Sequence, residues 1–156
     1  MLDRTKLVLT TVGRYQLYGS DLVAMCAKSG VDYVDLCGEP VWMSEMIPVH
    51  EEAAKASGAR IVFSCGFDSI PSDLGVYHLQ QLVKEKFGHV MPRVRCRVSK
   101  MKGTFSGGTA ASIKETLIAA KKDPAKMQAL LNPFSLTPGF TGAKQPYGNK
   151  PYYEED

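Results

Sequence analysis

Three short apolar segments of the chain each lead into a glycine, and this recurring arrangement constrains the fold more than any other feature. The segments span residues 6–13, 32–39 and 60–68. An apolar run of this length, closed by a turn residue, is typical of a buried strand. Helical patterns separate the three segments, so we expect parallel strands joined by crossover helices. No G-x-G-x-x-G turn, the backbone cradle for a pyrophosphate, precedes these strands in the sequence.

Helices are predicted after each strand, and glycines mark where they stop. Gly30, Gly58 and Gly88 each follow a helical pattern, as glycine commonly does just beyond a helix. Pro48 lies inside the second pattern and should kink or split it. The expected helices span residues 20–28, 41–57, 72–87, 110–121 and 124–131. The buried side of the third helix is expected to comprise Leu74, Tyr77, Leu79, Leu82 and Val83.

The alternation of strands and helices also predicts the fold class and the domains. It favours an α/β fold with part of a doubly wound parallel sheet, whose N-terminal phosphate-binding half is absent. Residues 1–91 should form the C-terminal half of a dinucleotide-binding domain. Residues 92–156 should begin a second, α+β domain, because residues 93–100 alternate polar and apolar side chains as an antiparallel strand does. An irregular tail is expected from residue 132 onward.

Composition and charge argue against several classes of protein. No segment approaches the roughly 18 consecutive apolar residues of a transmembrane helix. A formal net charge of +3, dispersed along the chain, argues against nucleic acid as a partner. The apolar run after Lys6 is too short for a signal peptide, so we expect a cytoplasmic protein. The cysteines form no C-x-x-C motif and have no histidine at zinc spacing, so we expect reduced thiols and no metal site.

The three glycine turns should meet at the carboxyl edge of the sheet, where open α/β sheets bind ligands. Gly13, Gly38 and Gly66 stand in these turns, and a glycine there lets a ligand approach the backbone closely. A simple connection between strand and helix explains the first turn equally well. Residues 106–109 resemble a small anion-binding nest before a helix, although a purely structural turn is the favoured interpretation.

Carboxylates in and beside these turns are the candidates for chemistry. Glu39 could bind a ribose, accept a proton or cap the next helix, and capping is favoured for a lone glutamate. Asp32, at the start of the second strand, should be solvated. Asp73 suits the first turn of a helix, where the dipole stabilises a negative charge. Asp68 is less readily explained by capping and is the better functional candidate.

Taken together, the turns resemble those of the saccharopine dehydrogenase-like oxidoreductases. Within that family they are most similar to the branch that includes the trans-acting enoyl reductases of lipid biosynthesis. The resemblance rests on residues 12–19, 32–39 and 65–75, in collinear order, and covers about residues 6–120. One departure is Arg14, which stands where the family usually has a proline between Gly13 and Tyr15.

The resemblance implies a partial Rossmann-like domain that binds NADP(H), joined to a domain that forms a substrate cleft and a dimer surface. The family's first strand and glycine-rich loop would come before these residues, and the family would continue beyond residue 156. The chain would then be an internal piece of a longer protein. A small-molecule substrate and a homo-oligomer are the partners that the resemblance implies.

The implied reaction is the transfer of a hydride from NADPH to an unsaturated, possibly lipid-like enoyl, or imine-type substrate. Asp68 would handle a proton or position the substrate. The residues expected along the cofactor are Thr11, Val12, Gly13, Cys37, Gly38, Gly66 and Phe67. The alternative is a non-catalytic interaction or dimerisation module, because a sheet without its earlier strands exposes an edge that invites pairing.

Overall fold

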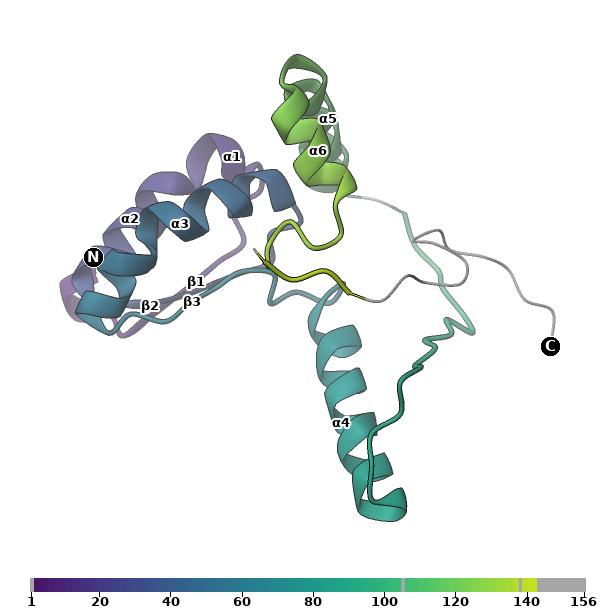
Figure 1. Cartoon of the computed structure of the whole chain (residues 1–156). Coiled ribbons are helices and arrows are strands. Elements are labelled where there is room, and N and C mark those ends of the chain that lie inside the picture. The colour runs from purple at the N-terminus through teal and green to yellow at the C-terminus, as the bar shows by residue number, and fades with distance from the viewer. Residues whose placement is uncertain (1, 105, 138, 143–156) are drawn as a thin grey trace.

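The computed structural model describes residues 2–104, 106–137 and 139–142, and it places a small open sheet beneath a layer of helices (Figure 1). The strands are β1 (Leu7–Thr10), β2 (Asp32–Asp35) and β3 (Ile61–Val62). A 3-10 turn, η1 (Leu2–Arg4), precedes them. The helices are α1 (Tyr15–Tyr18), α2 (Ser20–Ser29), α3 (Pro40–Ser57), α4 (Ile70–Phe87), α5 (Gly107–Lys122) and α6 (Pro124–Leu131).

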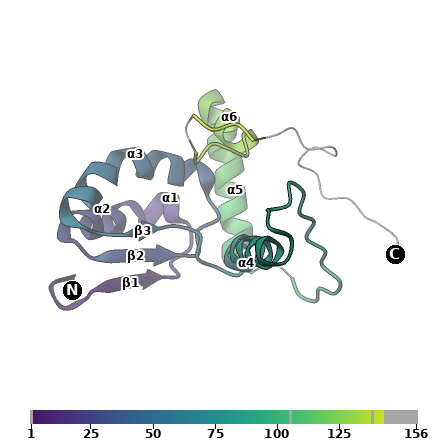
Figure 2. The ribbon, with the colours of Figure 1, turned by 60° about the horizontal axis from the view of Figure 1, so that its bottom comes forward.

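The strands are parallel and follow one another in the order β1-β2-β3. Tyr33 of β2 lies in register with Val8 of β1 and Ile61 of β3. Because crossovers between parallel strands are almost always right-handed, strands added in one direction place their helices on one face. Helices α2 and α3 indeed lie over the same face (Figures 1 and 2). The fold class is therefore confirmed: a mixed α/β protein whose small open sheet is consistent with part of a Rossmann-like fold.

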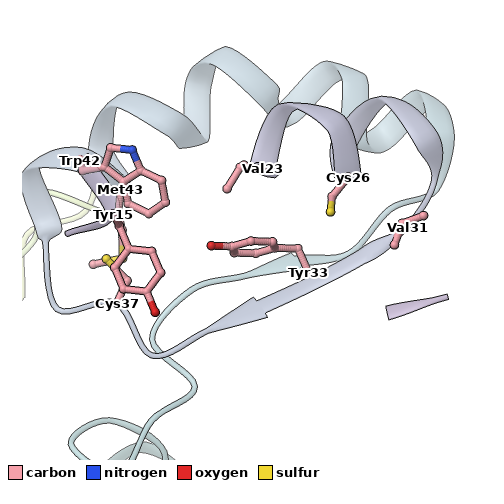
Figure 3. Close-up of a cluster of buried hydrophobic side chains, with 8 residues drawn as sticks. All are labelled: Tyr15, Val23, Cys26, Val31, Tyr33, Cys37, Trp42 and Met43. Carbon is pink, nitrogen blue, oxygen red and sulfur yellow. The ribbon is translucent and has the colours of Figure 1, made fainter. Parts of the chain in front are cut away.

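The core lies between this sheet and its helices (Figure 3). Tyr33 is fully buried beneath Val23 and Cys26 of α2. At the other end of the core, the ring of Trp42 stacks on Tyr15 at 5.6 Å between centroids, and Phe63 meets Trp42 edge-on at 5.4 Å. These contacts join α1, α3 and the residue after β3.

The helix ends follow the glycine pattern. Gly30, Gly58 and Gly88 adopt left-handed backbone conformations, with φ of 70°, 80° and 79°, directly after α2, α3 and α4. Helix α3 continues through Pro48 to Ser57, so Pro48 does not split it. Asp32 is only partly solvated, because its carboxylate pairs with the Arg60 guanidinium. Hydrogen bonding to this cation lowers the pKa of Asp32.

Two predictions about the second half of the chain are wrong. Helix α4 has no buried residue, and Leu74 and Tyr77 are 53% and 64% exposed. The helix runs away from the sheet (Figure 1), and Leu79 and Leu82 of the side that was expected to be buried are also exposed. Residues 93–100 form neither strand nor helix. Alternating polarity favours a strand, but a strand also needs a neighbouring strand with which to pair.

Helices α5 and α6 pack against each other, and α6 also contacts α3. Lys126 of α6 forms an ion pair with Glu45 of α3 at 2.8 Å. The division of the chain at residue 92 stays a prediction, and the predicted tail beyond residue 142 lies outside the described residues.

Candidate functional site

The turns after β1, β2 and β3 lie at the same edge of the sheet, toward which all three strands point (Figure 2). A side chain added at Gly13 or Gly38 would meet nothing within 4 Å, so the backbone is open at these two glycines. A side chain on Gly66 would come within 2.9 Å of the Leu36 Cβ. Gly66 therefore allows the second and third turns to pack closely, while Gly13 and Gly38 leave backbone exposed to a ligand.

Asp35 is the hydrogen-bonding centre of the second and third turns. Its side chain is 2% exposed, and one carboxylate oxygen accepts hydrogen bonds from the Cys37 amide at 3.0 Å and the Ser64 amide at 2.8 Å. The other oxygen accepts a hydrogen bond from the Tyr33 hydroxyl at 2.8 Å. Burial, and then this bond to Asp35, raise the pKa of Tyr33. The Cys65 amide also donates to the Asp35 carbonyl. Asp35 thus ties β2 to both turns.

Glu39 holds the start of α1, directly after the first turn. It is 2% exposed, and its two carboxylate oxygens accept hydrogen bonds from the amides of Tyr15 at 3.0 Å and Gln16 at 2.9 Å. These amides begin α1, for which the preceding residue, Arg14, supplies no side-chain cap. Capping was the favoured interpretation of Glu39, but the helix it caps is α1 rather than the next helix, α3.

The Cys37 side chain lies in the core and not on the exposed surface of the carboxyl edge. It is buried among the core residues of Figure 3, and desolvation raises the pKa of its thiol to about 12. The Cys37 carbonyl accepts a hydrogen bond from the Ser64 hydroxyl at 2.7 Å. Only the backbone of Cys37 can therefore take part in the predicted contact with a cofactor.

The other predicted site residues lie in exposed turns. Thr11, Val12 and Gly13 follow β1, and Gly38 follows β2. Phe67, 86% exposed, and Asp68 lie in the turn that leads from Gly66 into α4. The structure thus brings the predicted turns to one edge, and the roles of these residues toward a cofactor stay predictions.

Other candidate positions have structural uses. The Ser106 hydroxyl accepts a hydrogen bond from the Thr109 amide at 3.1 Å and caps α5, so residues 106–109 form the structural turn that was favoured. A groove of about 430 Å3 lies between α3 and β3, beside Met46, His50 and Ile61, and none of the predicted site residues lines it. Within residues 2–104, 106–137 and 139–142, no group of three metal-binding side chains is found. None of the helices in this part of the chain is long and apolar enough to cross a membrane.

Two structural roles were not predicted from the sequence: Asp35 as the hydrogen-bonding centre of two turns, and Glu39 as the cap of α1. A signal was present for Asp35, because side chains two apart on a strand share a face. The pattern that buries Tyr33 therefore also buries Asp35, and a buried carboxylate requires donors. Glu39 gives no such signal, since its partners are 23 and 24 residues away in the sequence.

These observations define an α/β protein with part of a Rossmann-like sheet and an ordered turn region at its carboxyl edge. Comparison with known proteins narrows the class. The chain is 45% identical over 151 residues, 97% of its length, to a Mycobacterium tuberculosis protein described provisionally as a trans-acting enoyl reductase. It is 40% identical over 138 residues, 88% of its length, to the trans-acting enoyl reductase of Mycobacterium leprae.

The chain spans about a third of the length of these curated relatives, 36% of the first and 33% of the second. No protein-family model matches the chain, and no solved structure matches it. The similarity thus concerns the trans-acting enoyl reductases themselves, and the wider saccharopine dehydrogenase-like resemblance stays a prediction.

Proposed function

We propose that the chain forms part of the cofactor-binding region of an NADPH-dependent enoyl reductase. The observation that carries this proposal is the 45% identity, over nearly the whole chain, to a protein described as a trans-acting enoyl reductase. The parallel sheet supports it, because open α/β sheets bind dinucleotides at the carboxyl ends of their strands. An unsaturated, lipid-like acyl group is the proposed substrate, and an imine-type substrate is the chemical alternative.

The residues at the edge fit the nicotinamide end of the cofactor better than its pyrophosphate end. Gly13 and Gly38 leave the backbone open, and Val12 and Phe67 offer exposed apolar surface for a ring. The sequence has no G-x-G-x-x-G turn for the phosphates. When bound, NADPH supplies the hydride for the reduction of a carbon–carbon double bond conjugated to a carbonyl.

The proposed role of the chain is to position the reactants and to manage a proton. Reduction of the double bond adds one hydride and one proton. Asp68, exposed in the third turn, is proposed to hold that proton or to orient the substrate carbonyl. The backbone at Thr11, Gly13 and Gly38 is proposed to support the nicotinamide.

Cofactor titration of the full chain tests this proposal. We expect NADPH to bind and to raise the thermal midpoint, with NADH at least about tenfold weaker. Gly38→Ala should weaken NADPH binding because the added methyl group occupies the open approach to the backbone. Gly75→Ala is the matched control, since an added side chain there also meets nothing within 4 Å but lies on α4. Equal binding by both variants, or none by the parent chain, contradicts the proposal.

Exposed apolar surface favours a second candidate, the interaction or dimerisation module. Leu7 and Leu9 of β1 and Val62 of β3 are about half exposed or more, and the described residues place no strand beyond β1. Such an edge and face invite pairing with another chain. Sedimentation equilibrium that gives a dimer, together with no protection by NADPH, favours this module. Binding of NADPH, in a monomer or a dimer, favours the reductase.

A further inference from the structure

We propose that Asp35 and Glu39 are positioning residues, which fix the shape of the cofactor edge from inside the core. The proposal rests on the function proposed above and assigns these two carboxylates a part in it. Both are almost completely buried, so neither can touch a cofactor at the edge. They act on the edge through the backbone amides that they hold.

The donors of these hydrogen bonds lie in or directly after the three turns. Glu39 holds the amides of Tyr15 and Gln16, at the start of α1 and directly after the turn that follows β1. Asp35 holds the amides of Cys37 and Ser64, in the turns after β2 and β3. Two buried carboxylates therefore fix backbone in two turns of the edge and at the end of the third. Burying a carboxylate is costly unless it is hydrogen-bonded, so each carboxylate depends on the turns that it holds.

The backbone is strained at two positions that these carboxylates hold. Among the described residues, Arg14 and Ser64 are the non-glycine residues with positive φ, at 56° and 60°. Left-handed backbone is unfavourable for such side chains and persists where surrounding contacts enforce it. Glu39 binds the two amides directly after Arg14, and Asp35 binds the amide of Ser64 itself. Each strained residue thus has a buried carboxylate as its anchor, and both lie in turns of the cofactor edge.

The groups that hold the turns are buried, whereas the open backbone of the turns is exposed. Asp35 and Glu39 are each 2% exposed, while Gly13 and Gly38 are exposed and an added side chain there meets nothing within 4 Å. A ligand can therefore contact these glycines without displacing either carboxylate. The arrangement pre-organises a binding surface, which lowers the ordering cost of binding.

Glu39→Gln in the full chain is the decisive variant. Glutamine keeps the volume, but its nitrogen faces an amide donor, so one of the two hydrogen bonds is lost. We expect NADPH affinity, measured by fluorescence titration, to fall about tenfold. Amide hydrogen exchange at Tyr15 and Gln16, measured by NMR without cofactor, should become at least about tenfold faster.

Controls separate positioning from general destabilisation. Ser20→Ala removes another internal hydrogen bond, from the Trp42 indole at 3.0 Å, and should lower stability without changing the NADPH dissociation constant. Arg14→Gly combined with Glu39→Gln should recover most of the lost affinity, because glycine adopts the left-handed backbone without strain. Asp35→Ala should weaken binding, and Asp35→Asn should restore it, since its oxygen still accepts both amides.

Unchanged affinity in Glu39→Gln overturns the proposal. An equal loss of affinity in Ser20→Ala overturns it too, because the effect would then follow stability alone. If the parent chain binds no NADPH, the proposed function fails, and hydrogen exchange alone decides the positioning role. Faster exchange at Tyr15 and Gln16 then supports the role of Glu39 in fixing the turn, and unchanged exchange contradicts it.

Discussion

Arg14 has a backbone conformation that proline cannot adopt, because its φ is 56° and proline fixes φ near about −65°. The resemblance described in the sequence analysis implies a proline here, so the first turn of this chain differs from what that resemblance implies. The Arg14 guanidinium lies over the Tyr18 ring, 5.5 Å from the centroid. Its charge therefore contacts α1, next to the two amides that Glu39 holds.

A pair of substitutions at residue 14 tests this account. Arg14→Gly should stabilise the chain by up to about 1 kcal/mol, because glycine relieves the left-handed strain. Arg14→Pro should destabilise it by about 2 kcal/mol or more, because proline fixes φ near −65°. Urea denaturation measures both. A proline variant as stable as the parent would show that the first turn has another conformation.

The buried thiol of Cys37 should make the free energy of unfolding depend on pH in the alkaline range. Burial raises the pKa of its thiol from 9.0 to about 12, so the folded chain retains a proton that the unfolded chain releases. The stabilisation is complete below pH 9 and is lost as the pH rises toward 12. The expected slope approaches about 1.4 kcal/mol per pH unit in that window.

Comparison with Cys37→Ala isolates this contribution. The variant should be less stable at neutral pH, because it leaves a small cavity, but its stability should fall less steeply between pH 9 and pH 12. The raised pKa values of Tyr33 and Cys26 act in the same direction in both proteins. Parallel denaturation curves across the pH range would show that Cys37 ionises normally.

At the scale of elements, sequence patterns located the strands and helices well and their surroundings poorly. The three strands and the ends of α2, α3 and α4 follow from local apolar spacing and glycine stops. The exposed state of α4 and the absence of a strand at residues 93–100 do not follow from these patterns. Burial of a helix and pairing of a strand depend on which other segments lie beside them, and local spacing carries no such information.

The candidate site was likewise only partly predictable from the sequence. Glycines after strands predicted that the turns meet at one edge, because parallel strands bring their carboxyl ends together. The turns are held by contacts distant in sequence, such as those of Glu39 with Tyr15 and Gln16. The sequence pattern identified Asp35 only as a residue of a strand. Its partner Ser64 is 29 residues away in the sequence, so local spacing could not reveal the contact.

Alanine substitutions at Gly66, which precedes α4, and at Gly75, which lies inside it, should change stability in opposite directions. Gly66→Ala places a methyl group within 2.9 Å of Leu36 Cβ, so we expect a loss of about 1–3 kcal/mol. Gly75→Ala lies inside α4, where an added methyl group meets nothing, and should stabilise the helix by up to about 1 kcal/mol. Thermal denaturation followed by circular dichroism compares them. Equal effects would contradict the close packing of the second and third turns.

At the scale of the whole molecule, the described residues cover one face of the sheet with helices and leave the other face open (Figure 2). Leu9, Val34 and Val62 lie in register across the three strands, and Leu9 and Val62 are exposed. We expect concentration-dependent self-association of the full chain through this face. Leu9→Lys should weaken the association by at least about tenfold, because it places a charge within the apolar row.

Val49→Lys is the matched control for that experiment. Val49 is also exposed, but it lies on α3, away from the open face of the sheet. Sedimentation velocity over a range of concentrations should show that this variant associates like the parent chain. Equal loss of association in both variants would show that the contact lies elsewhere. A parent chain that stays monomeric at every concentration would show that the expected self-association does not occur.

The burial of Asp35 and Glu39 also determines how the molecule should respond to ionic strength. Dissolved ions screen charges that face water, and they screen buried charges much less. The hydrogen bonds that Asp35 and Glu39 accept from the turns at the carboxyl edge of the sheet should therefore persist in concentrated salt. The pair between Lys126 and Glu45 is partly exposed, at 35% and 46% of their side chains, and salt should weaken it. Concentrated electrolyte should accordingly loosen α6 from α3 while the turns at the edge of the sheet keep their shape.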